Sequence, residues 1–171
     1  MKIVLIGFMG SGKTSVAESL AKILGLKFID MDELILKQLA YKSINEIFEK
    51  KGEKAFREME IVVAENLATA GDVIISTGGG VVTKKQTIVP LLKNAVVIYL
   101  KINFENATAR VSQKKIKPPL FQDIAKAKEL FNTREPLYTL YADIIIDTNH
   151  IGISEVVDNI VTEIKEIKNG G

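Results

Sequence analysis

The first residues that could perform chemistry form a glycine-rich segment at residues 7–14. Its sequence, Gly-Phe-Met-Gly-Ser-Gly-Lys-Thr, fits the phosphate-binding pattern GxxxxGK[ST]. The glycines allow a tight turn whose N–H groups face phosphate oxygens, the lysine reaches the outer phosphates, and the threonine hydroxyl is a ligand for Mg²⁺. The segment therefore predicts a site for a nucleoside triphosphate with Mg²⁺ as cofactor, and its binding residues are Gly10, Ser11, Gly12, Lys13, Thr14 and Ser15.

Two carboxylates follow the next apolar run. Asp30 and Asp32 come directly after residues 27–29, and a strand continued through them would point both side chains the same way, toward the phosphate loop. One carboxylate would then hold a water ligand of Mg²⁺, and the other would face an acceptor hydroxyl. Capping of the next helix is the alternative, because Asp often caps helices. We favour the catalytic interpretation because the phosphate loop provides a charged neighbour.

Further along the chain, two arginines and a run of glycines are candidates for binding an acid. Arg57 precedes Glu60 by one helical turn, so it forms either an ordinary surface ion pair or an arginine held by Glu60 and aimed at a substrate carboxylate. Residues 78–80 are three glycines, which expose backbone N–H groups and permit close approach of a ligand. Arg134 lies on a helical stretch that Pro136 interrupts or opens, and alone it would be a surface arginine.

The elements that must position these residues alternate between strand-like and helical patterns. Apolar runs at 2–6, 27–29, 72–76, 95–100 and 142–146 predict a parallel sheet covered by helices on both faces, a three-layer α/β/α fold. Ligands bind such sheets beyond the carboxyl ends of the strands, which is where the candidate residues fall. The stripe of apolar residues at 153–168 predicts a helix that covers the core.

Two segments interrupt this alternation. Residues 33–70 form a long, mostly helical insertion with a turn near residues 51–52, and we predict that it binds the substrate. Residues 112–122 contain three lysines and two prolines, which exclude a regular helix, and we predict a mobile cationic lid. An ordinary solvated loop is the alternative for this second segment.

Size and composition restrict the class of protein. A chain of 171 residues that is 47% hydrophobic predicts one domain over residues 1–171. It has no cysteine, which excludes disulfides and thiolate metal sites. A net charge of +2 with 6% aromatic residues gives no reason to expect a nucleic-acid partner. Because no apolar stretch is long enough to span a membrane and no signal region precedes the first strand, we expect a cytoplasmic protein without a membrane partner. We also expect a monomer.

Taken in order, the segments of this chain resemble the shikimate kinase family. The resemblance rests on GFMGSGKT, FIDMDELI, SINEIFEKKGEKAFREME and ISTGGGVV, followed by a basic lid and an arginine on the next helix. It covers nearly the whole chain. It implies a P-loop fold similar to that of nucleoside monophosphate kinases, with a five-stranded parallel sheet. It also implies transfer of the γ-phosphate of ATP to the 3-hydroxyl of shikimate, which gives shikimate 3-phosphate for aromatic amino-acid biosynthesis.

The resemblance implies roles for individual residues. Asp32 would contact the shikimate hydroxyls and act as base, Asp30 would hold Mg²⁺ through water, and Arg110 would stack on adenine. Arg57 and Arg134 would clamp the carboxylate of shikimate. The substrate site would then comprise Asp32, Arg57, Gly78, Gly79, Gly80 and Arg134.

The lid departs from the family pattern. The family usually has Arg-Pro-Leu-Leu there, whereas Pro118 takes the place of the arginine in this chain and Pro119-Leu120-Phe121 follow it. Lys117 is the nearest cation, with Lys115 behind it, so we predict that Lys117 binds phosphate and is catalytic together with Lys13 and Asp32. Two alternatives are a gluconate- or nucleotide-kinase-like enzyme of the same architecture, and a regulatory module that binds a nucleotide and phosphorylates nothing.

Overall fold

The computed structural model describes residues 1–115 and 117–169, so Ile116 of the predicted lid and the C-terminal Gly170 and Gly171 lie outside the described residues. Within these residues five strands form one parallel sheet, as predicted, and their order in the sheet is β2-β3-β1-β4-β5. The strands are β1 (Lys2–Ile6), β2 (Lys27–Asp30), β3 (Val73–Ser76), β4 (Ala95–Lys101) and β5 (Ile144–Asp147). The central strand β1 is buried along its whole length, which matches the apolar run at residues 3–6, and the ammonium of the buried Lys2 donates to the carbonyl of Ala68.

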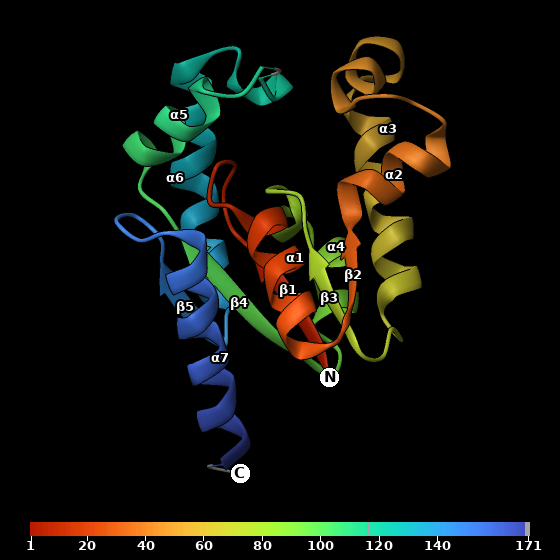
Figure 1. Cartoon of the computed structure of the whole chain (residues 1–171). Helices are drawn as coiled ribbons and strands as arrows, with labels where there is room; N and C mark the ends of the chain where they lie inside the picture. The colour runs from red at the N-terminus through yellow and green to blue at the C-terminus, as the bar shows by residue number, and fades with distance from the viewer. Residues whose placement is uncertain (116, 170–171) are drawn as a thin grey trace.

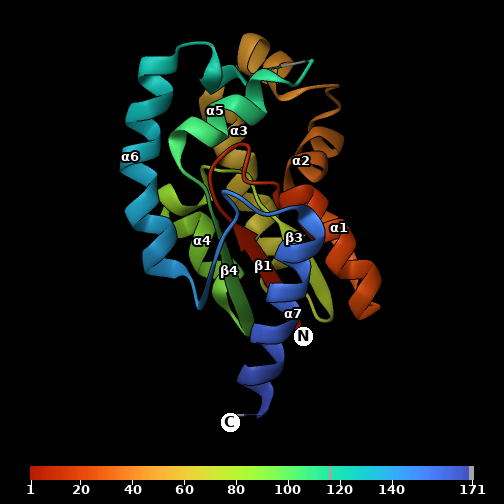
Figure 2. The same ribbon diagram turned by 60° about the vertical axis from the view of Figure 1, so that its left-hand side comes forward.

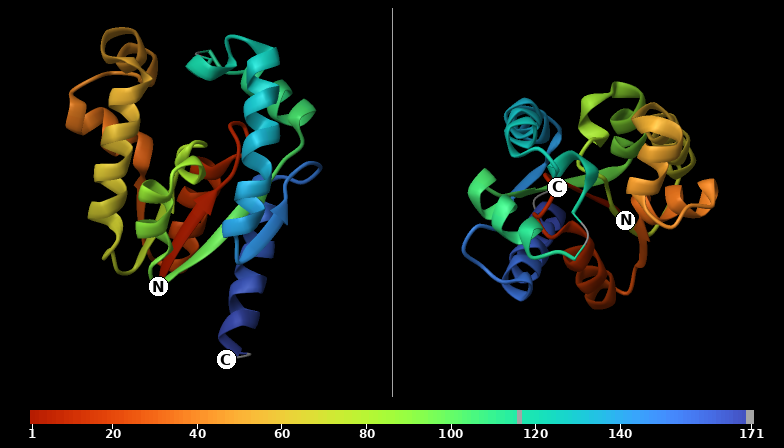
Figure 3. Two further views of the ribbon diagram at one scale, coloured as in Figure 1. Left: turned by 180° about the vertical axis from the view of Figure 1, so that it is seen from behind. Right: turned by 90° about the horizontal axis from the view of Figure 1, so that it is seen from above.

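Helices cover both faces of the sheet. On one face lie α1 (Lys13–Leu24) and α7 (Ile153–Asn169), which pack on Ile3 and Leu5 of β1 (Figures 1 and 2). The alternate residues Val4 and Ile6 face the second core on the other side. That side is covered by α3 (Ile44–Leu67), α4 (Lys85–Leu92) and α6 (Ile124–Tyr141), as Figure 3 shows from behind. The predicted three-layer α/β/α architecture is therefore confirmed.

Two groups of helices rise beyond the carboxyl ends of the strands, on opposite sides of the phosphate loop (Figure 1). One group consists of α2 (Met31–Leu39) and the first half of α3. The other consists of α5 (Phe104–Ser112), the short 3₁₀ turn η2 (Pro119–Phe121) and the start of α6. A further 3₁₀ turn, η1 (Val81–Thr83), follows the three glycines after β3.

Helix α3 bends at Gly52, at the position where the sequence predicted a turn. Gly52 has φ 81° and ψ 163°, a conformation outside the helical region that glycine adopts without steric cost. Ser43 begins this helix, and its side chain accepts a hydrogen bond from the N–H of Glu46. The bend divides α3 into two segments, and the second carries Arg57 and Glu60.

Two details of the local predictions were wrong. Strand β2 ends at Asp30, and Asp32 lies in the first turn of α2, so the argument from strand alternation does not apply. The cause is that the Asp30 side chain accepts hydrogen bonds from the N–H groups of Asp32 and Glu33 and so starts the helix. Helix α6 also continues through Pro136 to Tyr141, which puts Arg134 and the residues one turn later on one continuous helix.

Candidate functional site

A cavity of about 530 Å³ opens beyond the carboxyl ends of the strands. Its walls come from the phosphate loop, the α2–α3 insertion, the glycines after β3, the end of α5, the lid and α6. The side chains that give it charge are Lys13, Asp30, Asp32, Lys42, Arg57, Arg110, Lys114, Lys117 and Arg134. Cations outnumber carboxylates in this set, so the cavity suits a ligand or ligands with several negative charges.

Lys13 lies at the centre of the phosphate loop. Its ammonium donates to the carbonyl oxygens of Gly7 at 2.8 Å and Phe8 at 2.9 Å. Burial is the main cause that lowers the pKa of Lys13 to about 8, against the attraction of Asp32. Gly10 has φ +84°, and a Cβ there would lie 2.9 Å from the carbonyl oxygen of Ala107, so only glycine fits this close contact with α5.

The oxygen atoms that could hold a magnesium ion lie beside this loop. The Thr14 hydroxyl donates to Oδ2 of Asp30 at 2.9 Å and lies 3.4 Å from Oγ of Ser76. Asp30 caps α2 through its Oδ1, and its Oδ2 faces Thr14, so the cap leaves one carboxylate oxygen on the side of the phosphate loop. No three or more His, Cys, Asp or Glu side chains gather into a metal cluster in the described part of the chain. Such a set fits Mg²⁺, which takes few protein ligands and completes its shell with water and phosphate oxygens.

Sequence reasoning missed Ser76. The residue ends β3 and pairs in register with Asp30 at the end of β2. A polar residue at the end of a buried strand, next to another strand that ends in a candidate ligand, is the signal that could have identified it.

Asp32 stands between the phosphate loop and the insertion. Its Oδ1 atom is buried and has no hydrogen-bond partner among the described residues. Burial raises the pKa of this carboxyl to about 7, and the nearby carboxylates Asp30 and Glu60 act in the same direction. A buried acceptor without a partner, on the wall of the cavity, can accept a hydrogen bond from a ligand hydroxyl.

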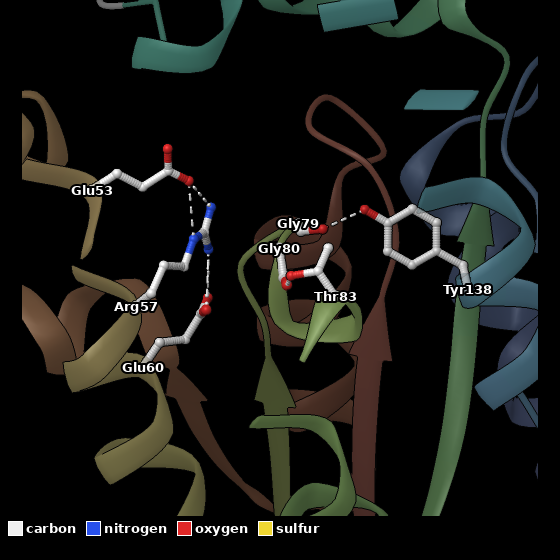
Figure 4. Close-up of polar contacts among 7 residues, drawn as sticks. All are labelled: Glu53, Arg57, Glu60, Gly79, Gly80, Thr83 and Tyr138. Atoms are coloured by element: carbon white, nitrogen blue, oxygen red, sulfur yellow. Dashed lines mark hydrogen bonds and ion pairs between the residues drawn. The ribbon is translucent and has the colours of Figure 1, made fainter. Parts of the chain in front are cut away.

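Arg57 is held by two glutamates, as Figure 4 shows. Its Nη1 donates to both oxygens of Glu60 at 3.1 and 3.0 Å, and its Nε and Nη2 donate to Oε1 of Glu53 at 3.2 and 3.1 Å. Glu60 is only 1% exposed, and burial raises its pKa. The pair is therefore not the ordinary surface ion pair that the sequence left open.

Arg134 is buried, with 3% of its surface exposed, although its local sequence suggested a surface position. It reaches the cavity from α6, and burial lowers its pKa. Its Nε atom has no partner within the described ranges. A buried guanidinium with a donor to spare is suited to a carboxylate, which it can bind through two parallel hydrogen bonds.

Three consecutive glycines separate these charged groups. A Cβ on Gly78 would lie 2.8 Å from Oδ1 of Asp32, and one on Gly80 would lie 2.3 Å from Nη1 of Arg57. A side chain at either position would therefore displace the Asp32 carboxylate or the Arg57 guanidinium. Gly79 has ordinary contact distances, 3.5 Å from a Cβ to the Tyr138 hydroxyl and 3.6 Å to Nη1 of Arg134.

The lid reaches the cavity from the opposite side. Lys114, Lys117 and residues 118–120 line the cavity, whereas Lys115 is not among the described residues that do so. Both lining lysines are exposed. The carbonyl of Lys117 accepts a hydrogen bond from the Asn45 side chain at 3.4 Å, which joins the lid to the insertion. Lys114 was missed by sequence reasoning, because three lysines close together give no indication of which ones face inward.

Arg110 connects the phosphate loop to the end of β5. Its guanidinium donates to the carbonyl of Gly10 at 3.3 Å and to that of Thr148 at 2.6 Å. It also lines the cavity, and its predicted stacking on adenine stays a prediction.

No helix in residues 1–115 and 117–169 is both long and apolar enough to cross a lipid bilayer.

Comparison with known proteins gives a consistent result. The sequence model of the family described as "Shikimate kinase" matches residues 9–165. The chain is 40% identical over 168 residues to a shikimate kinase from Caldanaerobacter subterraneus, covering 97% of each chain. It is 38% identical over 163 residues to one from Sulfurihydrogenibium sp., covering 95% of this chain and 97% of the relative. A structure of shikimate kinase from Acinetobacter baumannii in complex with shikimate superposes with a TM-score of 0.91 at 34% identity, covering 98% of this chain and 94% of the other.

Proposed function

The chain belongs to the shikimate kinase family, and from this we propose how its residues transfer the γ-phosphate of ATP to the 3-hydroxyl of shikimate. It is a phosphotransferase that acts on an alcohol group and uses ATP as co-substrate. The observation that carries the proposal is that one cavity is lined by the phosphate loop and by Arg57, Arg134 and the three glycines, the candidates for binding an acid. An enzyme that transfers a phosphoryl group from a triphosphate to a hydroxy acid must hold the two ligands within reach of each other.

At the nucleotide end, the loop amides and Lys13 would bind the β- and γ-phosphates. Thr14 and, through water, Asp30 would hold Mg²⁺, and the Ser76 hydroxyl lies close enough to Thr14 to orient it. When bound, Mg²⁺ would offset negative charge on the phosphate oxygens. Arg110 would lie against the adenine from the end of α5.

At the acceptor end, Arg57 and Arg134 would bind the carboxylate of shikimate. Glu53 and Glu60 fix the guanidinium of Arg57 from two sides, so the arginine is ordered before the ligand arrives. The Oδ1 atom of Asp32 would accept a hydrogen bond from the attacking hydroxyl. A pKa of about 7 suits a carboxyl that accepts a proton near neutral pH.

The lid would supply the remaining positive charge. Lys117 and Lys114 both line the cavity, which supports a role for lid lysines in binding phosphate. Phe121, which is buried against Phe8 and Phe104, anchors the end of the lid to the core. Closure over both ligands would exclude water and so limit hydrolysis of ATP. We also propose that the protein works in the cytoplasm, in line with its lack of cysteine, and that it is a monomer.

The decisive experiment is to measure ADP release from ATP and Mg²⁺ with and without shikimate, for the wild type and for Pro118→Arg. We expect release that depends on shikimate in both proteins, and faster release in the variant because it restores a guanidinium. Gluconate and nucleosides serve as control acceptors. Release that prefers one of these would identify another small-molecule kinase, and release with no acceptor dependence in either protein would favour the regulatory module.

A further inference from the structure

Tyr138 makes an unusual contact with the glycine segment. Its hydroxyl donates a hydrogen bond of 2.5 Å to the carbonyl oxygen of Gly79, from the opposite side to Arg57 (Figure 4). The residue is completely buried and stacks on Tyr99, with ring centroids 5.2 Å apart. Burial raises the pKa of the Tyr138 hydroxyl, so it remains a donor throughout the pH range in which proteins are stable. Tyr138 also lies one helical turn after Arg134 on α6, on the same face.

All three carbonyl oxygens of the glycine segment are bonded. The carbonyl of Gly78 accepts from the N–H of Val81, and that of Gly80 accepts from both the N–H and the hydroxyl of Thr83. Tyr138 supplies the donor for Gly79. In contrast, none of the three glycine N–H groups donates to an acceptor within the described part of the chain. The segment therefore has its acceptors satisfied and its donors available, an arrangement that favours an anion.

The bond from Tyr138 determines where one of these donors points. In a trans peptide, the C=O of one residue and the N–H of the next point in opposite directions. The Gly79 carbonyl points at Tyr138, so the N–H of Gly80 points away from Tyr138. Gly80 lies against Arg57, because a Cβ on it would meet that guanidinium, and it lines the cavity. The N–H of Gly80 is thus directed to the side of the segment on which Arg57 lies.

We propose that Tyr138 is a positioning residue for the substrate acid group. Its hydroxyl fixes the Gly79–Gly80 peptide, so that the N–H of Gly80 adds a third donor to the carboxylate bound by Arg57 and Arg134. The role of Tyr138 rests on the proposed function, because it concerns the same acceptor. If Tyr138 has this role, loss of its hydroxyl weakens the binding of the acceptor and leaves nucleotide binding unchanged. A purely structural role would affect both.

Tyr138→Phe tests this proposal, and Tyr99→Phe is its matched control. Both substitutions remove one hydroxyl from stacked, buried rings, but the Tyr99 hydroxyl has no partner among the described residues. We expect Tyr138→Phe to raise the KM for shikimate about tenfold, which corresponds to the loss of the hydrogen bond from the N–H of Gly80 to the charged carboxylate. The kcat and the KM for ATP should stay within about twofold of the wild type. Tyr99→Phe should leave all three values within about twofold.

A second variant and a second measurement make the test independent of folding. Thr83→Val should raise the KM for shikimate less than Tyr138→Phe does, because the Gly80 carbonyl still accepts a hydrogen bond from the N–H of residue 83 after the hydroxyl is lost. In ¹⁵N-labelled wild-type protein, the Gly80 amide resonance should shift when shikimate is added without nucleotide.

The possible failures are distinguishable. If the wild type releases ADP with shikimate but Tyr138→Phe and Tyr99→Phe give equal KM values, or the Gly80 amide does not shift, the positioning role is wrong. If the wild type shows no ADP release that depends on shikimate, the proposed function itself is wrong.

Discussion

The charged side chains on the floor of the cavity and those in its lid differ in their exposure to solvent. We define the floor as Lys13, Asp32 and Arg134, with Glu60 behind them. Lys13, Glu60 and Arg134 are buried, and so is the Oδ1 atom of Asp32. In the lid, Lys114 and Lys117 are exposed. Burial shifts the pKa values of Lys13 and Asp32 toward each other, to about 8 and about 7, so the floor holds its charges at a cost to folding. The exposed lid lysines impose no such cost.

This difference separates two kinds of contribution to catalysis. Charges on the floor are ordered before any ligand binds, and their effect does not depend on a conformational change. A lid lysine acts only after the lid closes, and solvent and salt screen it until then. Substitutions on the floor should therefore cause large losses, whereas substitutions in the lid should cause smaller losses that depend on ionic strength.

The largest effect is expected for Lys13→Met. This change removes the buried ammonium but retains a long side chain, and we expect kcat to fall about a thousandfold through the loss of charge stabilisation in the transition state. Lys22→Met is the control, because Lys22 is an exposed lysine on the same helix α1. Steady-state ADP release measures the activity of both variants, and circular dichroism checks that both are folded. If kcat falls no further in Lys13→Met than in a lid variant, the distinction between floor and lid is wrong.

The two glutamates that hold Arg57 allow a comparison within the floor itself. Glu60 has a side chain that is 2% exposed, and that of Glu53 is 48% exposed. Glu60→Gln should lower kcat/KM for shikimate roughly thirtyfold, because it leaves the guanidinium without its buried countercharge. Glu53→Gln should lower it less than about threefold, as expected for an exposed ion pair. The KM for ATP is the internal check, and equal effects of the two variants on shikimate would show that burial is not what orders Arg57.

The features that the sequence predicted are the local ones. The phosphate loop, its flanking strand and its helix lie within one stretch of chain, so pattern and structure agree from Lys2 to Leu24. The apolar runs also predicted all five strands, although Asp143 lies just outside β5, where its side chain accepts from the N–H of Val97. A buried parallel strand has a continuous apolar sequence that is independent of its neighbours, which is why such predictions succeed.

The features that the sequence could not predict depend on contacts between distant segments. The strand order places Ser76 beside Asp30, and the path of α6 places Arg134 and Tyr138 against the glycine segment. Local patterns contain no information on these pairings, since each one requires the completed sheet.

The position of Asp32 is a different case, because its cause is local. Asp30 caps α2, so the backbone at Asp32 is helical and not extended. The sequence offered this cap as an alternative, and we favoured the continued strand.

The lid is the region in which a single charge should matter less. Lys117→Ala should lower kcat about tenfold, because one exposed cation near the transferring phosphate is lost, and the loss should shrink as salt is added. Lys115→Ala is the matched control from the same loop, since Lys115 is not among the described residues that line the cavity. Turnover measured at low and high ionic strength provides the test. Unchanged turnover in Lys117→Ala would show that Lys117 does not replace the missing arginine, and Lys114→Ala would then be the next variant.

The smallest effect concerns the folding cost of the floor, measured on protein free of nucleotide and metal. The pKa of Asp32 is raised from 3.8 to about 7, so the folded state holds this proton more tightly than the unfolded state does. Stability from this group is therefore lost as the pH rises from about 4 to about 7. Asp32→Asn removes this dependence. At pH 7 it should be more stable than the wild type by about 1 kcal/mol, less than the whole pKa shift would give, because Asp32 is partly exposed and solvent screens part of the penalty.

Urea unfolding of both proteins in EDTA, at several pH values between 4 and 7, measures this difference. The advantage of Asp32→Asn should grow across the range. In the wild type, the pKa of Lys13 is about 8 and lies above this range, so Lys13 stays protonated in the folded and the unfolded state. Glu33→Gln, a substitution of an exposed residue in the same turn of α2, should leave the unfolding profile close to that of the wild type. If the profiles of Asp32→Asn and the wild type are parallel, the Asp32 carboxylate carries no folding cost. The difference in folding cost between the floor and the lid would then rest on the other buried charges, Lys13, Glu60 and Arg134.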